Sequence, residues 1–328
     1  MRARVLCVLL GGCDAEVDPP TWTIAAELDE SVGALLSVWG TSPADLRAVG
    51  GQIDSLGDPG VGAMLQRNGG AWDRVALPAG TPLLNWIHGA GGRTWAVGNA
   101  GAAVRSDDGG ATWTRDDAPV DVPLWGVFAF GPDEAWAVGG DAFDFEGTAV
   151  IVHHTGGAWE SVPMPELDRE SRALFKVWAS STSDVHAVGV RGVILHHDGN
   201  AWAQVPSDTD ADLISLWGTG PDEIVAVGGR DVGTIVRWNG SAWASATVPE
   251  IPGLNGVWLD ENGEAVLAGN EGRLADLEAS SMQPEILDTP PSFDVLHAAF
   301  GLDGTRLRYS VGGALRSAPY TGIVMELR

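Results

Sequence analysis

The sequence predicts an all-β protein, a seven-bladed β-propeller with four antiparallel strands in each blade. Three observations carry this prediction: a repeated segment, an unusual composition and a match between the two ends of the chain. The 328 residues contain 15 Trp and 45 Gly but only two Tyr. A repeat of about 40 to 50 residues that is rich in Trp and Gly is typical of propeller blades.

One segment recurs seven times along the chain. It begins with an apolar-aromatic pair such as Val38-Trp39 or Leu216-Trp217, and it ends at a glycine such as Gly50 or Gly228. The closing glycines are Gly50, Gly98, Gly139, Gly189, Gly228, Gly269 and Gly312. Consecutive closing glycines lie 39 to 50 positions apart. Each copy therefore has the length of one four-stranded blade.

The same order of strands is expected in every copy. An apolar inner strand ends in a turn of Gly/Ser-Pro-x-Asp type, and a second strand ends at the closing glycine. A third strand, such as 150–154, leads through a Gly-containing turn to an outer strand that Trp opens. These Trp residues are Trp72, Trp113, Trp159, Trp202 and Trp243. Their regular positions indicate core packing rather than sugar stacking. Blade six has Met282 near the expected place, so its outer strand is the least defined.

The two ends of the chain predict how the ring closes. The last copy supplies an inner strand, a second strand at 307–311 and a third at 323–327, and then the chain stops. The missing outer strand is found at 20–25, which reads like a fourth strand with its Trp. We expect the N-terminal strand to pair beside 323–327, because an open ring would leave an unpaired sheet edge. The propeller then covers residues 20–328.

The first residues indicate export. Arg2 and Arg4 precede the apolar run 5–10, which is too short to span a membrane and is typical of a signal peptide. The following Leu10-Gly11-Gly12-Cys13 resembles the lipobox of bacterial lipoproteins, in which the Cys thiol is lipidated and becomes the first mature residue. The resemblance implies a signal peptide at 1–12 and a lipidated Cys13 with a short linker at 13–19. The alternative is an ordinary secretory signal in which the Cys is incidental.

This resemblance also implies a location. An exported lipoprotein of the bacterial cell envelope is held on the periplasmic or the outer-surface side, and only its lipid contacts the membrane. Forty-four acidic residues against 19 basic residues give a net charge of −25, which disfavours nucleic acid and anionic headgroups. Lys176 is the only lysine, so no Gly-Lys-Ser/Thr phosphate loop exists. The sequence also lacks a Gly-x-Ser-x-Gly elbow and a His-Glu-x-x-His motif.

Blade two carries a recognisable turn motif. Residues 106–113 match the Asp-box, Ser/Thr-x-Asp-x-Gly-x-x-Trp, through Ser106, Asp108, Gly110 and Trp113. The Asp side chain caps backbone N–H groups, Gly takes a positive φ and Trp fills the space between blades. The motif resembles the repeats of sialidase-like propellers, which implies a glycan-acting hydrolase as one function. Sialidases need a nucleophilic Tyr–Glu pair, for which only Tyr309 and Tyr320 are available, so an enzyme is not the favoured interpretation.

Propellers of this repeat type also resemble the photosystem-assembly factor family, which acts by binding partner proteins. That resemblance implies a non-catalytic binding or scaffolding module for an envelope protein or glycan partner, and we expect a monomer. The variable loops predict where the partner binds, because loops on a rigid scaffold usually carry function. Insertions at 52–62, 141–147 and 313–322 share one face of the disc. The candidate contact residues are Asp141, Phe143, Asp144, Phe145, Glu146, Arg169, Arg172, Arg230, Arg316 and Tyr320.

No metal or other cofactor is expected. Asp208, Asp210 and Asp212 resemble the opening of a calcium loop, but the glycine and distal Glu of that loop are absent. The loop at 141–147 offers further carboxylates, so calcium remains an alternative to solvated acidic loops. The pairs His153-His154 and His196-His197 occupy equivalent positions in neighbouring blades. Successive strand residues point to opposite faces, so neither pair is expected to chelate one metal ion.

Overall fold

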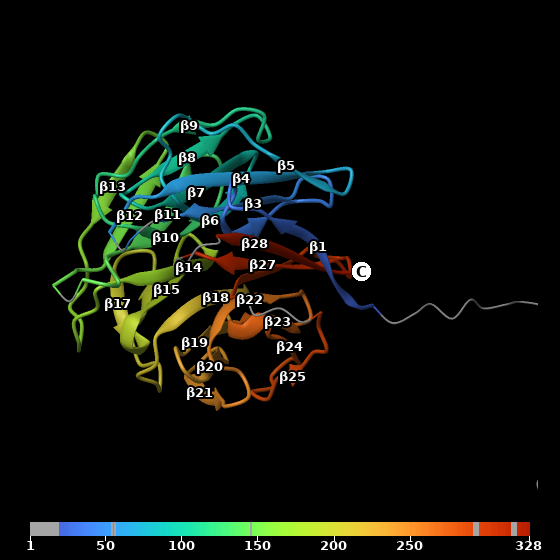
Figure 1. Cartoon of the computed structure of the whole chain (residues 1–328). Helices are drawn as coiled ribbons and strands as arrows, with labels where there is room; N and C mark the ends of the chain where they lie inside the picture. The colour runs from blue at the N-terminus through green and yellow to red at the C-terminus, as the bar shows by residue number, and fades with distance from the viewer. Residues whose placement is uncertain (1–19, 54, 56, 145, 291–294, 316–319) are drawn as a thin grey trace, which may run out of the picture.

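The computed structural model describes residues 20–53, 55, 57–144, 146–290, 295–315 and 320–328 (Figure 1). These residues form seven antiparallel four-stranded sheets around a central axis, which confirms the predicted seven-bladed propeller. Within these ranges, no helix has the length and apolar character needed to cross a membrane. The predicted signal peptide and Cys13, the predicted lipidation site, lie outside the described residues.

The strands follow one another from the inside of each blade to its outside. Blades 1 to 4 contain β2 (Ala34–Trp39), β3 (Arg47–Gln52), β4 (Val61–Asn68), β5 (Ala71–Arg74); β6 (Leu84–Ala90), β7 (Arg93–Gly98), β8 (Ala103–Ser106), β9 (Thr114–Arg115); β10 (Leu124–Ala129), β11 (Glu134–Gly139), β12 (Val150–Thr155), β13 (Trp159–Val162); β14 (Leu174–Ser181), β15 (Asp184–Gly189), β16 (Ile194–His197), β17 (Trp202–Val205). Blades 5 to 7 contain β18 (Leu213–Gly220), β19 (Glu223–Gly228), β20 (Gly233–Trp238), β21 (Trp243–Val248); β22 (Leu254–Leu259), β23 (Ala265–Gly269), β24 (Leu274–Leu277), β25 (Glu285–Ile286); β26 (Leu296–Gly301), β27 (Arg308–Ala314), β28 (Thr321–Leu327), β1 (Trp22–Leu28). Short 3-10 turns lie at Val190–Gly192 and Asn270–Gly272.

The ring is closed by the pairing of the two chain ends. Strand β1 runs antiparallel to β28, with Trp22 opposite Leu327 and Leu28 opposite Gly322. The Thr21 N–H donates to the carbonyl of Arg328 at 3.2 Å. The inner strands β2 and β26 are also in contact, so blades 7 and 1 pack together like any other neighbours. The predicted closure by the N-terminal strand is confirmed.

The repeated glycine that ends each second strand has a steric cause. In all seven blades, a Cβ atom at this glycine would collide with a carbonyl oxygen at the start of the same blade's inner strand. At Gly98 the atom in the way is Leu83 O, and at Gly228 it is Asp212 O. The next residue donates its N–H to that carbonyl, as Asn99 does to Leu83 at 2.9 Å. Only glycine permits this close approach of two backbones.

The repeated tryptophans hold neighbouring blades together. Trp113, Trp159, Trp202 and Trp243 are all buried, as the expected core packing requires. Trp159 of blade 3 meets Trp95 of blade 2 edge to face, with ring centroids 5.0 Å apart. Blade 6 lacks such a Trp, and its outer strand β25 is only two residues long. Strand β9 of blade 2 is equally short although Trp113 is present, so a missing Trp alone does not explain the length of β25.

The Asp-box of blade 2 forms the turn that its pattern predicts. Asp108 Oδ1 accepts hydrogen bonds from the Thr112 N–H at 2.9 Å and from Ser106 Oγ at 2.8 Å. Hydrogen bonds from the Thr112 hydroxyl and N–H, together with that from Ser106, lower the pKa of Asp108 to about 2. Gly110 has a φ of +86°, and the Trp113 indole N–H donates to its carbonyl. These contacts are all internal to the turn, so the motif stabilises the hairpin.

Candidate functional site at the channel mouth

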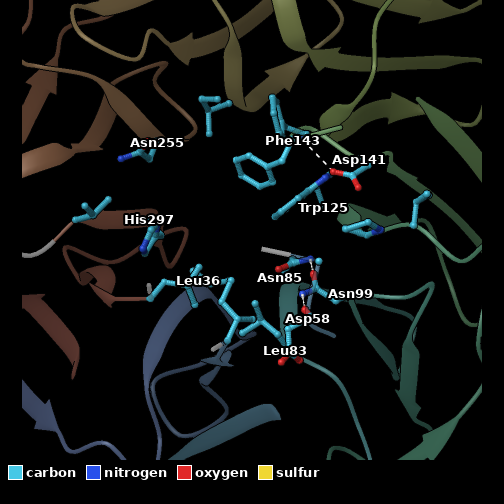
Figure 2. A pocket seen from close by; sticks show the side chains of 18 of the residues that line it. Leu36, Asp58, Leu83, Asn85, Asn99, Trp125, Asp141, Phe143, Asn255 and His297 are labelled. Atoms are coloured by element: carbon cyan, nitrogen blue, oxygen red, sulfur yellow. Dashed lines mark hydrogen bonds between the residues drawn. The ribbon is translucent and has the colours of Figure 1, made fainter. Parts of the chain in front are cut away.

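A cavity of about 750 Å³ lies at one mouth of the central channel and is lined by residues from all seven blades. It opens on the face that carries the links between blades and the loops between second and third strands. Figure 2 shows the side chains of Leu36, Asn85, Trp125, Asn255 and His297 arranged around this space. The volume is within the range of about 300–1,000 Å³ that is usual for ligand sites.

A β-bulge at the same place in every blade forms the wall of this cavity. In blade 3, Leu124 pairs with Gly139 and Gly126 pairs with Val138, so Trp125 has no partner in the second strand. The register between the first two strands shifts at the same position in the other six blades. The seven skipped residues are Leu36, Asn85, Trp125, Phe175, Ile214, Asn255 and His297, and all of them line the cavity. A bulge re-aims a side chain, so the seven bulges direct these residues into the mouth.

Most of the lining is apolar. Four of the seven bulge residues are the large apolar side chains Leu36, Trp125, Phe175 and Ile214. Phe143 extends this surface from the loop that follows blade 3's second strand; it is 40% exposed, and its ring centroid lies 6.5 Å from that of Trp125. An apolar surface of this kind favours a ligand with a large apolar group.

The two asparagines among the bulge residues tie neighbouring blades together. Asn85 donates through Nδ2 to Asn99 Oδ1 at 3.1 Å and to Leu124 O in the next blade at 2.9 Å. Asn255 makes the equivalent bonds to Asn270 Oδ1 and Leu296 O. Their amide donors are therefore committed to the fold. Asn85 Oδ1 is buried and accepts no hydrogen bond within the described residues.

The only lysine of the chain lies in the lining, beside the bulge of blade 4. Lys176 is 8% exposed, and its Nζ donates to Trp125 O at 3.1 Å. The same Nζ lies 3.8 Å from the ring centroid of Trp86, because Gly126 of the intervening blade has no side chain. Burial lowers the pKa of Lys176 to about 7, so the ammonium group readily loses its proton at this position.

Aromatic side chains from the same inner strands pack together near the channel axis. His88 of blade 2 stacks on Phe128 of blade 3 with centroids 4.4 Å apart, and Trp217 of blade 5 meets both rings. His88 is 8% exposed, and its Nδ1 accepts the N–H of Ala129 at 3.0 Å. Burial lowers the pKa of His88 to about 3. Each of these rings lies three residues after the bulge residue of its own strand. The contacts of Trp217 with His88 and Phe128 link blade 5 to blades 2 and 3, which are not all neighbours in the ring.

Only some of the predicted contact residues meet at the cavity. Asp141, Phe143 and Arg230 line it, whereas Asp144 and Glu146 are exposed on the same loop as Asp141. Arg169 forms an ion pair with Asp210 in a separate cavity that also includes Arg191. Arg172 and Tyr320 are partly exposed and do not line the channel mouth. Phe145 and Arg316 lie outside the described residues.

Sequence reasoning missed the bulge residues themselves. They were hidden because each is the first of two variable positions that follow the first apolar residue of the inner strand. The signal that could have found them is the recurring order of an apolar residue, two variable residues and a further apolar residue, as in Leu124 to Val127. The position that varies in a repeat that otherwise stays constant is a candidate for ligand specificity.

The acidic stretches do not gather into a cation site within the described residues. Asp212 accepts from the Arg191 N–H and from the Arg230 side chain, and Asp210 pairs with Arg169. The consecutive histidines point apart, as expected. His196 faces His186, whereas His197 packs against Trp136 and Trp202. The contact of His196 with His186 and Asp184 is not evident from the sequence.

Comparison with known proteins shows the fold and no closer relationship. No protein-family model matches the sequence, and no curated protein matches it. YCF48 bound to a D1 peptide is similar at 14% identity with a TM-score of 0.66, over 95% of this chain and 98% of that one. YCF48 from Cyanidioschyzon merolae is similar at 14% identity with a TM-score of 0.67, over 94% of this chain and 98% of that one. The WD40 propeller domain of Doa1 is similar at 9% identity with a TM-score of 0.67, over 93% of this chain and 96% of that one. The chain is therefore a seven-bladed propeller similar in structure to YCF48 and to WD40 propellers.

Proposed function

We propose that this propeller is a non-catalytic binding module whose channel mouth receives an extended segment of a partner protein. The single observation that carries the proposal is the ring of seven bulge residues, which all line one cavity. The fold accepts a polar residue at this repeat position, because Asn85 and Asn255 occupy it in two blades where Leu36 and Ile214 occupy it in two others. The binding of a D1 peptide by YCF48, which has a similar fold, supports a peptide as the ligand class.

The polar groups of the cavity favour a peptide over a sugar. A sugar offers many hydroxyl groups and needs many donors and acceptors, but the amide donors of Asn85 and Asn255 are already bonded within the protein. The large apolar side chains of the lining, Trp125 and Ile214 among them, instead match an apolar side chain of a peptide. We infer that the partner places a large apolar side chain against Phe143 and Ile214.

The charges at the cavity favour basic residues beside that apolar side chain. Asp58, Asp121 and Asp141 line the cavity. Of the Lys and Arg side chains among the described lining residues, Arg230 is already paired with Asp212 at 2.9 Å, and burial lowers the pKa of Lys176 to about 7. The whole chain also carries a net charge of −25, which steers cationic partners toward it. The segment that binds therefore combines a large apolar residue with Lys or Arg.

We also propose that the module is an exported lipoprotein of the bacterial envelope, anchored through Cys13. The resemblance of residues 10–13 to a lipobox supports this proposal. Replacing Cys13 with Ser should move the protein from the membrane fraction to the soluble fraction of the cell. An unchanged membrane fraction for Cys13→Ser would contradict the proposed anchor, and it would leave the proposal on peptide binding intact.

The alternative, a glycan-acting hydrolase of sialidase type, finds little support in the geometry. Tyr309 and Glu326 do meet, with Tyr309 OH donating to Oε1 at 3.1 Å. However, these two residues are 0% and 1% exposed and lie outside the lining of the cavity. Burial and the charge of Glu326 raise the pKa of Tyr309 to about 12, which opposes its use as a nucleophile. The pair instead belongs to the contact between blades 7 and 1.

A selection from a random library of displayed 12-residue peptides tests the binding proposal. The immobilised protein should enrich peptides that carry a large apolar residue next to Lys or Arg. Ile214→Asn, which copies the residue of blades 2 and 6, should weaken binding of an enriched peptide at least tenfold. Ile24→Asn, on the exposed outer strand β1, is the matched control and should bind like the wild type.

Two outcomes would overturn this proposal. One is the absence of any enriched peptide, and the other is an enriched peptide that binds Ile214→Asn and wild type equally well. A glycan array and fluorogenic glycosides tested in parallel decide the alternative. Glycan binding that Ile214→Asn abolishes, or release of the fluorophore, would favour a glycan-directed function over a peptide-binding one.

A further inference from the structure

A second group of chemically active side chains lies on blade 4, at the end of the blade away from the channel mouth. Asp184 and His186 are two residues apart on β15, so they point to the same face of the sheet. His196 on β16 pairs directly opposite His186 and shares that face. One ligand atom from each of the three residues lies within 4.8 Å of the others.

The two imidazoles converge on one carboxylate oxygen. Nε2 of His186 lies 3.1 Å from Asp184 Oδ1, and Nε2 of His196 lies 2.8 Å from the same atom. The two rings are stacked, with centroids 4.5 Å apart and an interplanar angle of 19°. Ligand atoms that share a tetrahedral Zn²⁺ at about 2.0–2.1 Å lie about 3.3 Å apart. The two separations from Asp184 Oδ1 lie within about half an ångström of that spacing, and the two imidazole nitrogens lie within 4.8 Å of each other, so they must approach to share one ion.

Equivalent positions in other blades hold a permanent cation. In blade 1 the carboxylate of Asp45 pairs with Arg47, and in blade 5 that of Glu223 pairs with Arg237. Arg47 occupies the position that His186 has in blade 4, and Arg237 occupies the position that His196 has. Blade 4 keeps the carboxylate but replaces arginine with two imidazoles. A metal ion would supply the positive charge that the arginines supply elsewhere.

We propose that Asp184, His186 and His196 bind one divalent transition-metal ion of the zinc class, with a further coordination position open to water. Two imidazoles and one carboxylate suit zinc rather than calcium or magnesium, which prefer oxygen ligands. The side chains of His196 and Asp184 are 32% and 21% exposed, so an ion can enter from solvent. His186 Nδ1 has no hydrogen-bond partner among the described residues, so no outer hydrogen bond fixes the orientation of its ring. We therefore expect an affinity about 10–100-fold weaker than that of a site in which both rings are held by such a hydrogen bond.

This site is separate from the channel mouth, so the two proposals fail independently. The test is titration of the full-length protein, stripped with EDTA, with Zn²⁺ in a calorimeter and with Co²⁺ in a spectrophotometer. We expect one Zn²⁺ per chain and visible Co²⁺ absorption bands typical of a tetrahedral or five-coordinate site. Calcium should produce no heat of binding at the same site.

Two variants make the test specific. His196→Gln removes one ligand at a partly exposed position where folding should be retained, and it should weaken Zn²⁺ binding at least tenfold. His197→Gln is the matched control, because the adjacent ring packs against Trp202 on the other face of the strand. The proposal is overturned if the wild type binds no stoichiometric Zn²⁺, if His196→Gln binds as tightly as the wild type, or if His197→Gln weakens binding equally.

Discussion

The contact between the last and first blades is held by a buried charged cluster that can be tested quantitatively. Arg67 on β4 of blade 1 reaches Glu326 on β28 of blade 7, with Nη2 3.1 Å from Oε1. Its Nη1 donates to Tyr309 OH at 2.8 Å, and that hydroxyl donates in turn to Glu326. The side chains of Arg67 and Glu326 are 10% and 1% exposed. The pair is thus largely removed from water.

Replacing Glu326 with Gln keeps the shape of the side chain and removes the charge that compensates Arg67. Removal of one member of a buried ion pair typically costs about 3–5 kcal/mol of unfolding free energy. Arg67 keeps Tyr309 OH as a hydrogen-bond acceptor, so we expect about 3 kcal/mol. The double variant Arg67→Met, Glu326→Gln leaves no uncompensated buried charge, because Arg328, the other partner of Glu326, has a side chain that is 62% exposed. It should regain about 2 kcal/mol of that loss.

Urea unfolding followed by tryptophan fluorescence measures these free energies, since the chain has 15 Trp. Asp210→Asn serves as the control. The side chains of Asp210 and Arg169 are 74% and 53% exposed, so this ion pair should contribute less than about 1 kcal/mol. The reasoning is refuted if Glu326→Gln costs less than about 1 kcal/mol. It is also refuted if the double variant loses as much unfolding free energy as the single variants Arg67→Met and Glu326→Gln lose together.

Two further predictions concern pH. In the unfolded chain His88 takes up a proton near pH 6.5, whereas in the folded protein burial lowers its pKa to about 3. Because only the unfolded state is protonated between pH 7 and 5, the free energy of unfolding should fall by about 2 kcal/mol over this range. His88→Phe, the residue that blade 3 has as Phe128, should reduce the measured loss by that amount; an unchanged loss would contradict the assignment. Lys176, with a pKa lowered to about 7, should make the protein about 2 kcal/mol more stable at pH 9 than at pH 7. Lys176→Met should abolish that rise in denaturant titrations, and its persistence would count against the burial argument.

The fold could be predicted from the sequence because each repeat carries its own strands and turns. The spacing of the closing glycines gives the blade length, and the Trp22 strand supplies the outer strand that the last copy lacks. These signals are local, so no long-range contact had to be known beforehand. The prediction was weakest in blade 6, where no Trp anchors the outer strand.

The two candidate sites could not be predicted in the same way, because both depend on strand register. Trp125 and its equivalents point into the channel only because a bulge removes them from the pairing. His186 and His196 become neighbours only because the hairpin between β15 and β16 places them opposite each other. A shift of one residue would have turned His196 to the other face. The sequence names these side chains but does not give the register that brings them together.

The position of the chain's first described residues bears on how a tethered propeller would be oriented. Thr21 and Trp22 lie beside Arg328 and Leu327, at the end of blade 7 away from Leu315 and the channel mouth. A lipid on Cys13, as we propose, is separated from Pro20 by seven peptide steps, which reach at most about 25 Å. The bilayer would then adjoin the hairpin side of the disc. The cavity would then open on the side away from the bilayer, where a partner in solution or a segment of a neighbouring envelope protein can reach it.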